Sequence, residues 1–241
     1  MTEKRQPANS DHRYAPSGRK PERGFTLVEL MLAILILGLV VTTVLVSYNA
    51  VFSTTASLEN SSDIYEMAKN CLKQMTVDLE SIHVALPPIY RKPEFDDEPS
   101  DFRVQGLSED LSGTGFAQLR FTSRAHLPLE NSQRRGIAEI VYYVQTTEDG
   151  SQVLKRSDNL YPYPEFESKG ADPTLCERVK SLAFTFFDEE GSDTDSWNSE
   201  SDSFEYATPR AIGIELEIGD ETRSHRFKTL VHLPVYRQNF E

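Results

Sequence analysis

Residues 24–41 read GFTLVELMLAILILGLVV, and apolar residues continue to about Val46. The roughly 22 residues from Phe25 to Val46 would form a helix of about 33 Å, long enough to cross the hydrocarbon core of a bilayer. Basic residues precede this stretch: Arg5, Arg13, Arg19, Lys20 and Arg23. Because basic residues before a first span hold that end in the cytoplasm, we expect the chain after the span to lie outside the inner face.

Two residues distinguish this stretch from an ordinary secretory signal. Glu29 lies inside the apolar run, where a carboxylate costs on the order of a few kcal/mol, so it calls for a partner such as an ammonium of another chain. Gly24 comes before the apolar core, whereas the small residues of a secretory cleavage site come after it. Cleavage between Gly24 and Phe25 would therefore remove a hydrophilic leader and keep the apolar helix.

The residues from Arg23 to Glu29 resemble the type IV prepilin signal, which type IV pilins share with the pseudopilins of type II secretion. The matching features are Gly before the cut, Phe after it and Glu fifth in the mature chain. The resemblance implies cleavage after Gly24 by a membrane prepilin peptidase and N-methylation of Phe25. It also implies that Glu29 helps to dock the helix against the N-terminal amine of a neighbouring subunit. The alternative is a plain signal anchor with an interfacial glutamate.

The 241 residues of the chain divide into a short basic part and a long acidic part. The formal net charge is −13, and residues 1–24 carry a net +3, so the remaining chain carries −16. This acidity argues against nucleic-acid binding and is consistent with solubility or a cation site. The expected parts are a cleaved cytoplasmic leader (1–24), a transmembrane half-helix (25–46), an amphipathic half-helix (47–86) and a β-rich head (87–241).

Apolar periodicity predicts one long helix followed by strands. Apolar residues recur at three- and four-residue steps from Val51 to Ile82, with a weak point at Asn60-Ser61-Ser62 and an end before Pro87-Pro88. Residues 87–115, which include the acidic Glu94, Asp96, Asp97 and Glu98, are expected to form a connector, and residues 157–176 a long loop. Strands are expected at 116–122, 137–145, 152–156, 179–187, 210–218 and 223–233, with a hairpin turn at Glu148-Asp149-Gly150. The predicted fold class is α+β, with the long N-terminal helix packed on an antiparallel sheet.

The C-terminal half is similar to minor pseudopilin J of the type II secretion system. The resemblance rests on the segments 179–188 and 209–216, on Gly191 and Trp197 between them, and on 141–144, 154–156 and Asp78-Leu79. It implies a structural subunit that forms a tip complex with minor pseudopilins I and K and starts a short periplasmic pseudopilus. The major pseudopilin and the prepilin peptidase would be further partners, with a single pass through the inner membrane and the head in the periplasm. A minor pilin of a type IV pilus is the nearest competing interpretation.

Catalytic patterns are missing from the sequence. The histidines His12, His83, His126, His225 and His232 are scattered and lack H-E-x-x-H or similar spacing. The chain has no G-x-S-x-G turn and no phosphate-binding glycine loop. We therefore expect no enzyme activity and no cofactor. An anchored periplasmic hydrolase and a signal-anchored binding module are the alternatives from other classes.

Two smaller questions stay open in the sequence. The acidic stretch with Asp188, Glu189, Glu190, Asp193 and Asp195 contains only a fragment of a calcium loop. The preferred prediction there is a solvated loop with no metal, and the alternative is calcium bound by Asp188, Glu190, Asp193 and Asp195. Cys71 and Cys176 are the only cysteines. In an oxidising periplasm they would form either a disulfide between helix and head or two buried thiols.

Overall fold

The computed structural model of the chain describes residues 24–94, 99–112, 114–128, 135–220 and 223–239, without the side chains of residues 50–61, 110 and 111. The chain divides into two compact units, Met1–Ala56 and Ser57–Glu241. Most of the expected leader, residues 1–23, lies outside the described residues, as do Asp96, Asp97 and Glu98 of the expected acidic connector.

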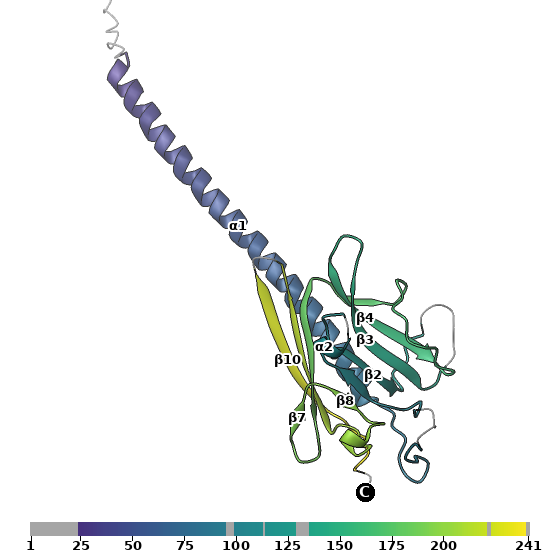
Figure 1. Cartoon of the computed structure of the whole chain (residues 1–241). Helices are drawn as coiled ribbons and strands as arrows, with labels where there is room; N and C mark the ends of the chain where they lie inside the picture. The colour runs from purple at the N-terminus through teal and green to yellow at the C-terminus, as the bar shows by residue number, and fades with distance from the viewer. Residues whose placement is uncertain (1–23, 95–98, 113, 129–134, 221–222, 240–241) are drawn as a thin grey trace, which may run out of the picture. The chain divides into compact units, whose positions relative to one another are not determined.

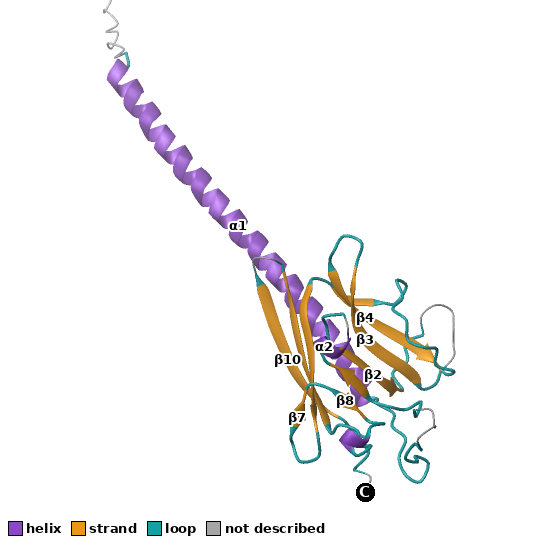
Figure 2. Ribbon diagram, viewed as in Figure 1, coloured by secondary structure: helices purple, strands orange, loops and turns teal. Residues whose placement is uncertain are grey.

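Helix α1 runs from Leu27 to Glu80 and is drawn in purple in Figure 2. Its first part contains a candidate membrane span of 23 residues, Leu27–Asn49, with a mean hydropathy of 2.8 and no buried residues. The expected transmembrane half at 25–46 agrees closely with this span. Helical structure also continues through residues 60–62, where the sequence suggested a weak point.

The end of α1 differs from the prediction, which placed it just before Pro87. After Glu80 the backbone leaves the helix because it pairs with a neighbouring strand instead. Ile82 forms a β-bridge with Ser123, and the His83 amide donates to the Thr122 carbonyl at 2.8 Å. A tertiary contact therefore ends the helix before the prolines are reached.

The second unit contains two antiparallel sheets, and Figure 1 labels β2, β3, β4 and β8 of the larger sheet and β7 and β10 of the smaller one. The larger sheet has the order β5-β4-β3-β2-β1-β8, with β1 Gln105–Leu107, β2 Gln118–Ser123, β3 Ala138–Thr146, β4 Gln152–Leu160, β5 Thr174–Cys176 and β8 Trp197–Asn198. The smaller sheet has the order β10-β9-β6-β7, with β6 Val179–Phe187, β7 Asp193–Thr194, β9 Ala211–Gly219 and β10 Ser224–His232. The short helix α2 spans Glu109–Ser112, and a 3-10 turn spans Asp202–Phe204. The predicted α+β class with an antiparallel head is confirmed.

One apolar core joins the last turns of α1 to both sheets. The helix contributes buried side chains at three- and four-residue intervals: Ile64, Ala68, Cys71, Met75 and Leu79. The sequence predicted this spacing with Ala68, Met75 and Leu79 in it, but it also placed Tyr65 on the apolar face, and Tyr65 is 56% exposed. Buried residues of the larger sheet, such as Phe121, and of the smaller sheet, such as Leu216, belong to the same cluster. The helix from Ser57 onward is therefore part of the second unit, together with the two sheets.

Two segments expected as loops contain pairing strands. The connector 87–115 includes β1, and the stretch 157–176 includes the end of β4 and the edge strand β5. Lys155 of β4 is buried, and its ammonium donates to the carbonyls of Gly170 at 2.8 Å and Asp172 at 2.9 Å. These two residues belong to the loop between β4 and β5, so Lys155 holds this loop against the sheet. Long-range pairing of this kind leaves little local pattern in a sequence.

The insert between β6 and β9 crosses from one sheet to the other. Its β7 belongs to the smaller sheet, whereas β8 pairs with β1 of the larger one through Gly106 and Trp197. The buried Trp197 indole donates to the Ala207 carbonyl at 3.0 Å. The buried Arg237 guanidinium donates to the Ser199 carbonyl at 2.6 Å and to the Tyr206 carbonyl at 2.6 Å. The expected solvated loop is therefore partly an ordered bridge between the sheets.

Gly106 of β1 lies directly against the Phe186 ring of β6 in the other sheet, and this gives a first prediction. A Cβ at this position would come within 1.9 Å of Cζ of the buried Phe186 ring. Gly106→Ala is expected to lower the free energy of unfolding by about 1–3 kcal/mol, as overpacking of a dense core does. Thermal unfolding of the purified protein measures this loss.

Gly213→Ala is the matched control, because a Cβ there meets Thr185 Cβ at 3.4 Å, an ordinary contact. This strand position should tolerate alanine or gain a few tenths of a kcal/mol to about 1 kcal/mol. Equal stabilities for the two variants would contradict the close approach of the sheets at Gly106.

Candidate functional site

The first candidate site is the segment directly before α1. Gly24, Phe25 and Thr26 are exposed and non-helical, with the Phe25 side chain 89% exposed. A Cβ at Gly24 would meet nothing within 4 Å. The first helical hydrogen bond in this region runs from the Leu30 amide to the Thr26 carbonyl at 3.2 Å. The peptide bond between Gly24 and Phe25 therefore lies outside the helical hydrogen bonding, where an enzyme can bind it in extended form.

Thr26 and Glu29 form a reciprocal capping box at the helix start. The Thr26 amide and hydroxyl both donate to Glu29 Oε2, at 2.9 and 3.0 Å. In return, the Glu29 amide donates to Thr26 Oγ1 at 3.2 Å. These bonds satisfy donors that a helix N-terminus leaves unpaired. Sequence analysis missed this cap, although the spacing Thr-x-x-Glu was its signal.

The cap uses one oxygen of the Glu29 carboxylate and leaves the other, Oε1, available to a further partner. Among the described residues, all its hydrogen bonds use Oε2, and none reaches Oε1. Residues 24–56 contain no Lys, Arg or His, so after cleavage at Gly24 this stretch would hold no side-chain cation to pair with Glu29. After cleavage at Gly24, the amine of Phe25 would supply a positive charge at the same end of the helix. Carboxylates within membrane spans are usually paired with a positively charged group.

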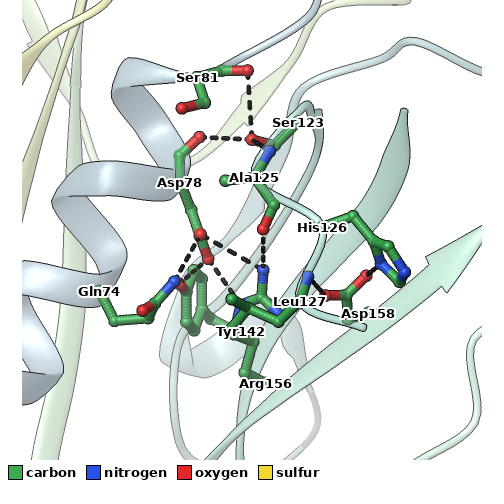
Figure 3. A network of polar contacts seen from close by, with 10 residues as sticks. All are labelled: Gln74, Asp78, Ser81, Ser123, Ala125, His126, Leu127, Tyr142, Arg156 and Asp158. Carbon is green, nitrogen blue, oxygen red and sulfur yellow. Dashed lines mark hydrogen bonds and ion pairs between the residues drawn. The ribbon is translucent and has the colours of Figure 1, made fainter. Parts of the chain in front are cut away.

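The second candidate site fastens the last turns of α1 to the larger sheet (Figure 3). Asp78 of α1 is fully buried, and its Oδ2 accepts hydrogen bonds from the Tyr142 hydroxyl and from Arg156 Nε, the latter at 2.6 Å. Arg156 Nη2 donates to Asp78 Oδ1 at 3.3 Å, and Gln74 donates to the same oxygen at 2.8 Å. Helix, β3 and β4 thus meet at one carboxylate.

A second carboxylate, that of Asp158, also pairs with Arg156. Arg156 Nη1 donates to Asp158 Oδ2 at 2.5 Å, and Nη2 donates to the Ala125 carbonyl at 3.0 Å. Asp158 Oδ1 lies 2.6 Å from His126 Nδ1 (Figure 3). Arg156 is 1% exposed, so water contributes little to solvating these charges.

The pKa values of Tyr142 and Arg156 are both raised, which keeps these two groups protonated. Burial, and then the charge and hydrogen bond of Asp78, raise the pKa of Tyr142 well above its ordinary value, so the phenol stays protonated and donates. Burial by itself lowers the pKa of Arg156, but the bonds and charges of Asp78 and Asp158 outweigh it, and the pKa is raised. Arg156 therefore stays charged, and its hydrogen bonds to Asp78 hold the end of α1 in a fixed register on the sheet.

Sequence reasoning did not identify this network, although it noted Asp78-Leu79 as part of a resemblance. The available signal was an aspartate on the apolar stripe of the helix, between Met75 and Leu79. Its partner Arg156 is 78 positions away in the sequence, so the pairing itself depends on the fold.

The four residues of the alternative calcium site do not converge on one point. Asp188, Glu190 and Asp193 line one open pocket, but Asp195 does not. Asp188 Oδ1 accepts a hydrogen bond from the Ser192 amide at 2.8 Å. Across the described part of the chain, no three His, Cys, Asp or Glu side chains are grouped in a way that suits a metal ion.

The two cysteines and the described histidines are placed as follows. Cys71 and Cys176 are both buried and carry free thiols. His83 packs edge-on against Phe102, and His225 lies against Tyr65 with ring centroids 5.4 Å apart. His126 pairs with Asp158, His232 is exposed, and His12 lies outside the described residues.

Comparison with known families assigns both parts of the chain. A family model described as type II secretion system (T2SS), protein J, matches residues 46–230. A second model, described as the prokaryotic N-terminal methylation motif, matches residues 19–45. The two matches adjoin without overlap, so the motif covers the segment around Gly24 and most of the span, and protein J covers the rest of the helix and nearly all of the head. No curated protein matches the chain.

Proposed function

Because the chain belongs to the family of type II secretion system protein J, we propose that it is a structural subunit of the pseudopilus tip. In this role it forms a complex with minor pseudopilins I and K, and this complex primes assembly of the major pseudopilin. The resulting short fibre drives folded proteins across the outer membrane. The protein J family is a structural component of secretion, which favours a scaffold over an enzyme.

The observation that carries the proposal is the arrangement around Gly24. The scissile peptide is exposed, and the residues of the helix cap, Thr26 and Glu29, both remain after the cut. Prepilin peptidase could therefore remove residues 1–24 and methylate Phe25 without disturbing the start of α1. A matching methylation motif supports this processing.

The proposed membrane topology follows from the positive charge of the leader and the length of the apolar span. The span Leu27–Asn49 is long enough to cross the inner membrane once, and the basic leader precedes it. The second unit would then lie in the periplasm, where the ion pair of Asp78 and Arg156 would link the helix to the sheet. A subunit that is pushed or pulled through its helix needs such a fixed attachment.

Two competing functions can be distinguished from the proposed one, the first by the family match and the second by the requirement for Glu29. A minor pilin of a type IV pilus would use the same N-terminal segment, but the match to protein J across 46–230 favours type II secretion. A signal-anchored binding module would need the apolar helix without needing Glu29, and the response to loss of that carboxylate distinguishes it.

Replacing the residue before the cut tests the proposed processing. Gly24→Val is expected to abolish cleavage, because a β-branched side chain occupies a position where the peptidase motif has glycine. The uncut chain should accumulate in membranes, and secretion of type II substrates should fall to the level of cells that lack the protein. Immunoblotting and a secretion assay measure the two effects.

Gly38→Ala is the matched control, since this glycine lies within the span and a Cβ there meets nothing within 4 Å. It should be cleaved and should support secretion as the parent does. Normal cleavage of Gly24→Val would contradict the proposed site. Normal secretion in cells lacking the protein altogether would contradict the proposed function.

A further inference from the structure

The two cysteines come together although they are far apart in the sequence. Cys71 lies on the buried face of α1, and Cys176 is the last residue of the edge strand β5. Their exposed fractions are 2% and 1%, and both belong to the apolar core of the second unit. They are the only cysteines of the chain, so each has a single candidate partner within it.

The backbone around β5 positions Cys176 against the helix. Cys176 pairs with Leu154 of β4, which fixes it on the larger sheet. The next residue, Glu177, donates its amide to Met67 Sδ at 3.4 Å. Met67 lies one helical turn before Cys71, so the chain leaves β5 along the turn of α1 that carries Cys71.

The thiols also influence one another directly. A hydrogen bond with Cys176, followed by burial and the charge of Cys176, raises the pKa of the Cys71 thiol. An S–H group forms only weak hydrogen bonds, so this contact stabilises the core little in the reduced state. Two thiols buried in the same apolar core, one on α1 and one on the strand beside it, are suited to a covalent bond instead.

We propose that Cys71 and Cys176 form a disulfide that ties α1 to the edge strand β5 in the mature protein. The proposal rests on the proposed function in one respect, which is that the head lies in an oxidising periplasm. The bond would hold a strand of only three residues, Thr174–Cys176, on the helix.

The reaction is an exchange with a protein disulfide of the cell envelope. One cysteine thiolate attacks a sulfur of that oxidant and forms a mixed disulfide, and the other cysteine then attacks the mixed disulfide. Two S–H bonds and the S–S bond of the oxidant are broken, the Cys71–Cys176 bond forms, and the oxidant takes up two electrons and leaves as a dithiol. Because the folded thiols are buried and the pKa of Cys71 is raised, oxidation should occur before the head has closed.

Thiol counting on the full-length protein tests the proposal. Protein from membranes is denatured and treated with a maleimide polymer, with and without prior reduction, and the added mass is read on a gel. The expected result is no added polymer before reduction and two after it. Cys71→Ala and Cys176→Ala should each take up one polymer without reduction, because the remaining cysteine has lost its partner.

A protease added to spheroplasts reports the position of the head in the same cells. Two reactive thiols before reduction on a protease-sensitive, periplasmic head would overturn the disulfide and leave the proposed function intact. A protected, cytoplasmic head would instead overturn the proposed location. In that case refolding of the purified full-length protein in a glutathione redox buffer decides the pairing, and failure to form the bond there would overturn it.

Stability gives a second readout. In the oxidised protein, reductant is expected to lower Tm by about 10 °C, since the bond closes a loop of roughly 100 residues. The double variant with Cys71→Ala and Cys176→Ala should unfold at a Tm that reductant does not change. An equal response of parent and double variant would contradict a stabilising disulfide.

Discussion

Arg156→Met is expected to lower the free energy of unfolding of the head by about 3–5 kcal/mol, because it leaves Asp78 buried without its counter-charge. The carboxylate is 0% exposed, and water cannot replace the guanidinium without opening the core. For a unit of this size the loss corresponds to a fall in Tm of roughly 10 °C. Thermal unfolding of the detergent-purified protein, followed by circular dichroism, measures it.

Arg226→Met is the matched control for this prediction. Arg226 also carries two ion pairs, to Glu215 and Glu217, but its side chain is 59% exposed. Exposed pairs of this kind contribute about 0–1 kcal/mol, so the control should change Tm by a few degrees at most. Equal losses in the two variants would contradict the special role of the buried pair.

A double variant separates two effects on stability: the cost of leaving Asp78 buried without a partner, and the net contribution of the Asp78–Arg156 ion pair. Asp78→Leu combined with Arg156→Met removes both charges, and it should recover part of the stability that the single change loses. Asp158 and Tyr142 would still lose their contacts with these residues, so full recovery is not expected. The stability lost by the double variant is compared with the sum of the losses in the two single variants. A larger loss in the double variant would contradict the account and show that other interactions hold the network together.

Glu29→Leu is expected to reduce secretion of type II substrates at least tenfold while the protein still inserts and is cleaved. Leucine makes the span more apolar, which favours insertion. It also removes the carboxylate that would meet the N-terminal amine of a neighbouring subunit. Secretion is measured in cells lacking the native protein, with membrane levels and cleavage followed by immunoblotting.

Glu29→Gln distinguishes charge from capping. An amide oxygen at this position can still accept the bonds from the Thr26 amide and hydroxyl, but it carries no charge. If the charge is required, Gln should fail as Leu does. If Gln restores secretion, the helix cap is the function of this residue. Full secretion by the Leu variant would favour the signal-anchored binding module.

Strands with strong local patterns were predicted correctly from the sequence. The alternation in β6 and β9 comes from one face buried in the core and the other outside, as in Ile212, Ile214, Leu216 and Ile218 of β9. The hairpin between β3 and β4 followed from Glu148-Asp149-Gly150, and Gly150 has a φ of 84° that favours glycine. Local chemistry was sufficient in these places.

Elements that depend on distant partners were missed or misplaced. The helix ends at Glu80 because residues 81–83 pair with β2, and the prolines that guided the prediction lie beyond that point. The strands β1 and β8 are short and form only by pairing with each other and with β2. Their sequences carry too few residues for a visible alternation.

The candidate sites divide in the same way. Gly24, Phe25 and Glu29 form a local motif, so the sequence alone was enough to propose them; the methylation motif matches residues 19–45, which include them, and the role of each residue stays a prediction. The ion pair of Asp78 and Arg156 required the fold to bring helix and sheet together. In the acidic stretch after β6, closeness in sequence supported only the alternative of a calcium site, and among the described residues these carboxylates, including Asp195, do not converge on one point.

The intact mass of the protein extracted from membranes tests the central claim most directly, which is that the chain is processed as a pseudopilin and keeps its apolar helix. The predicted mass corresponds to residues 25–241 with one added methyl group, and fragmentation should place that methyl on the amine of Phe25. A chain that still begins at Met1, or one trimmed anywhere other than between Gly24 and Phe25, would contradict the claim.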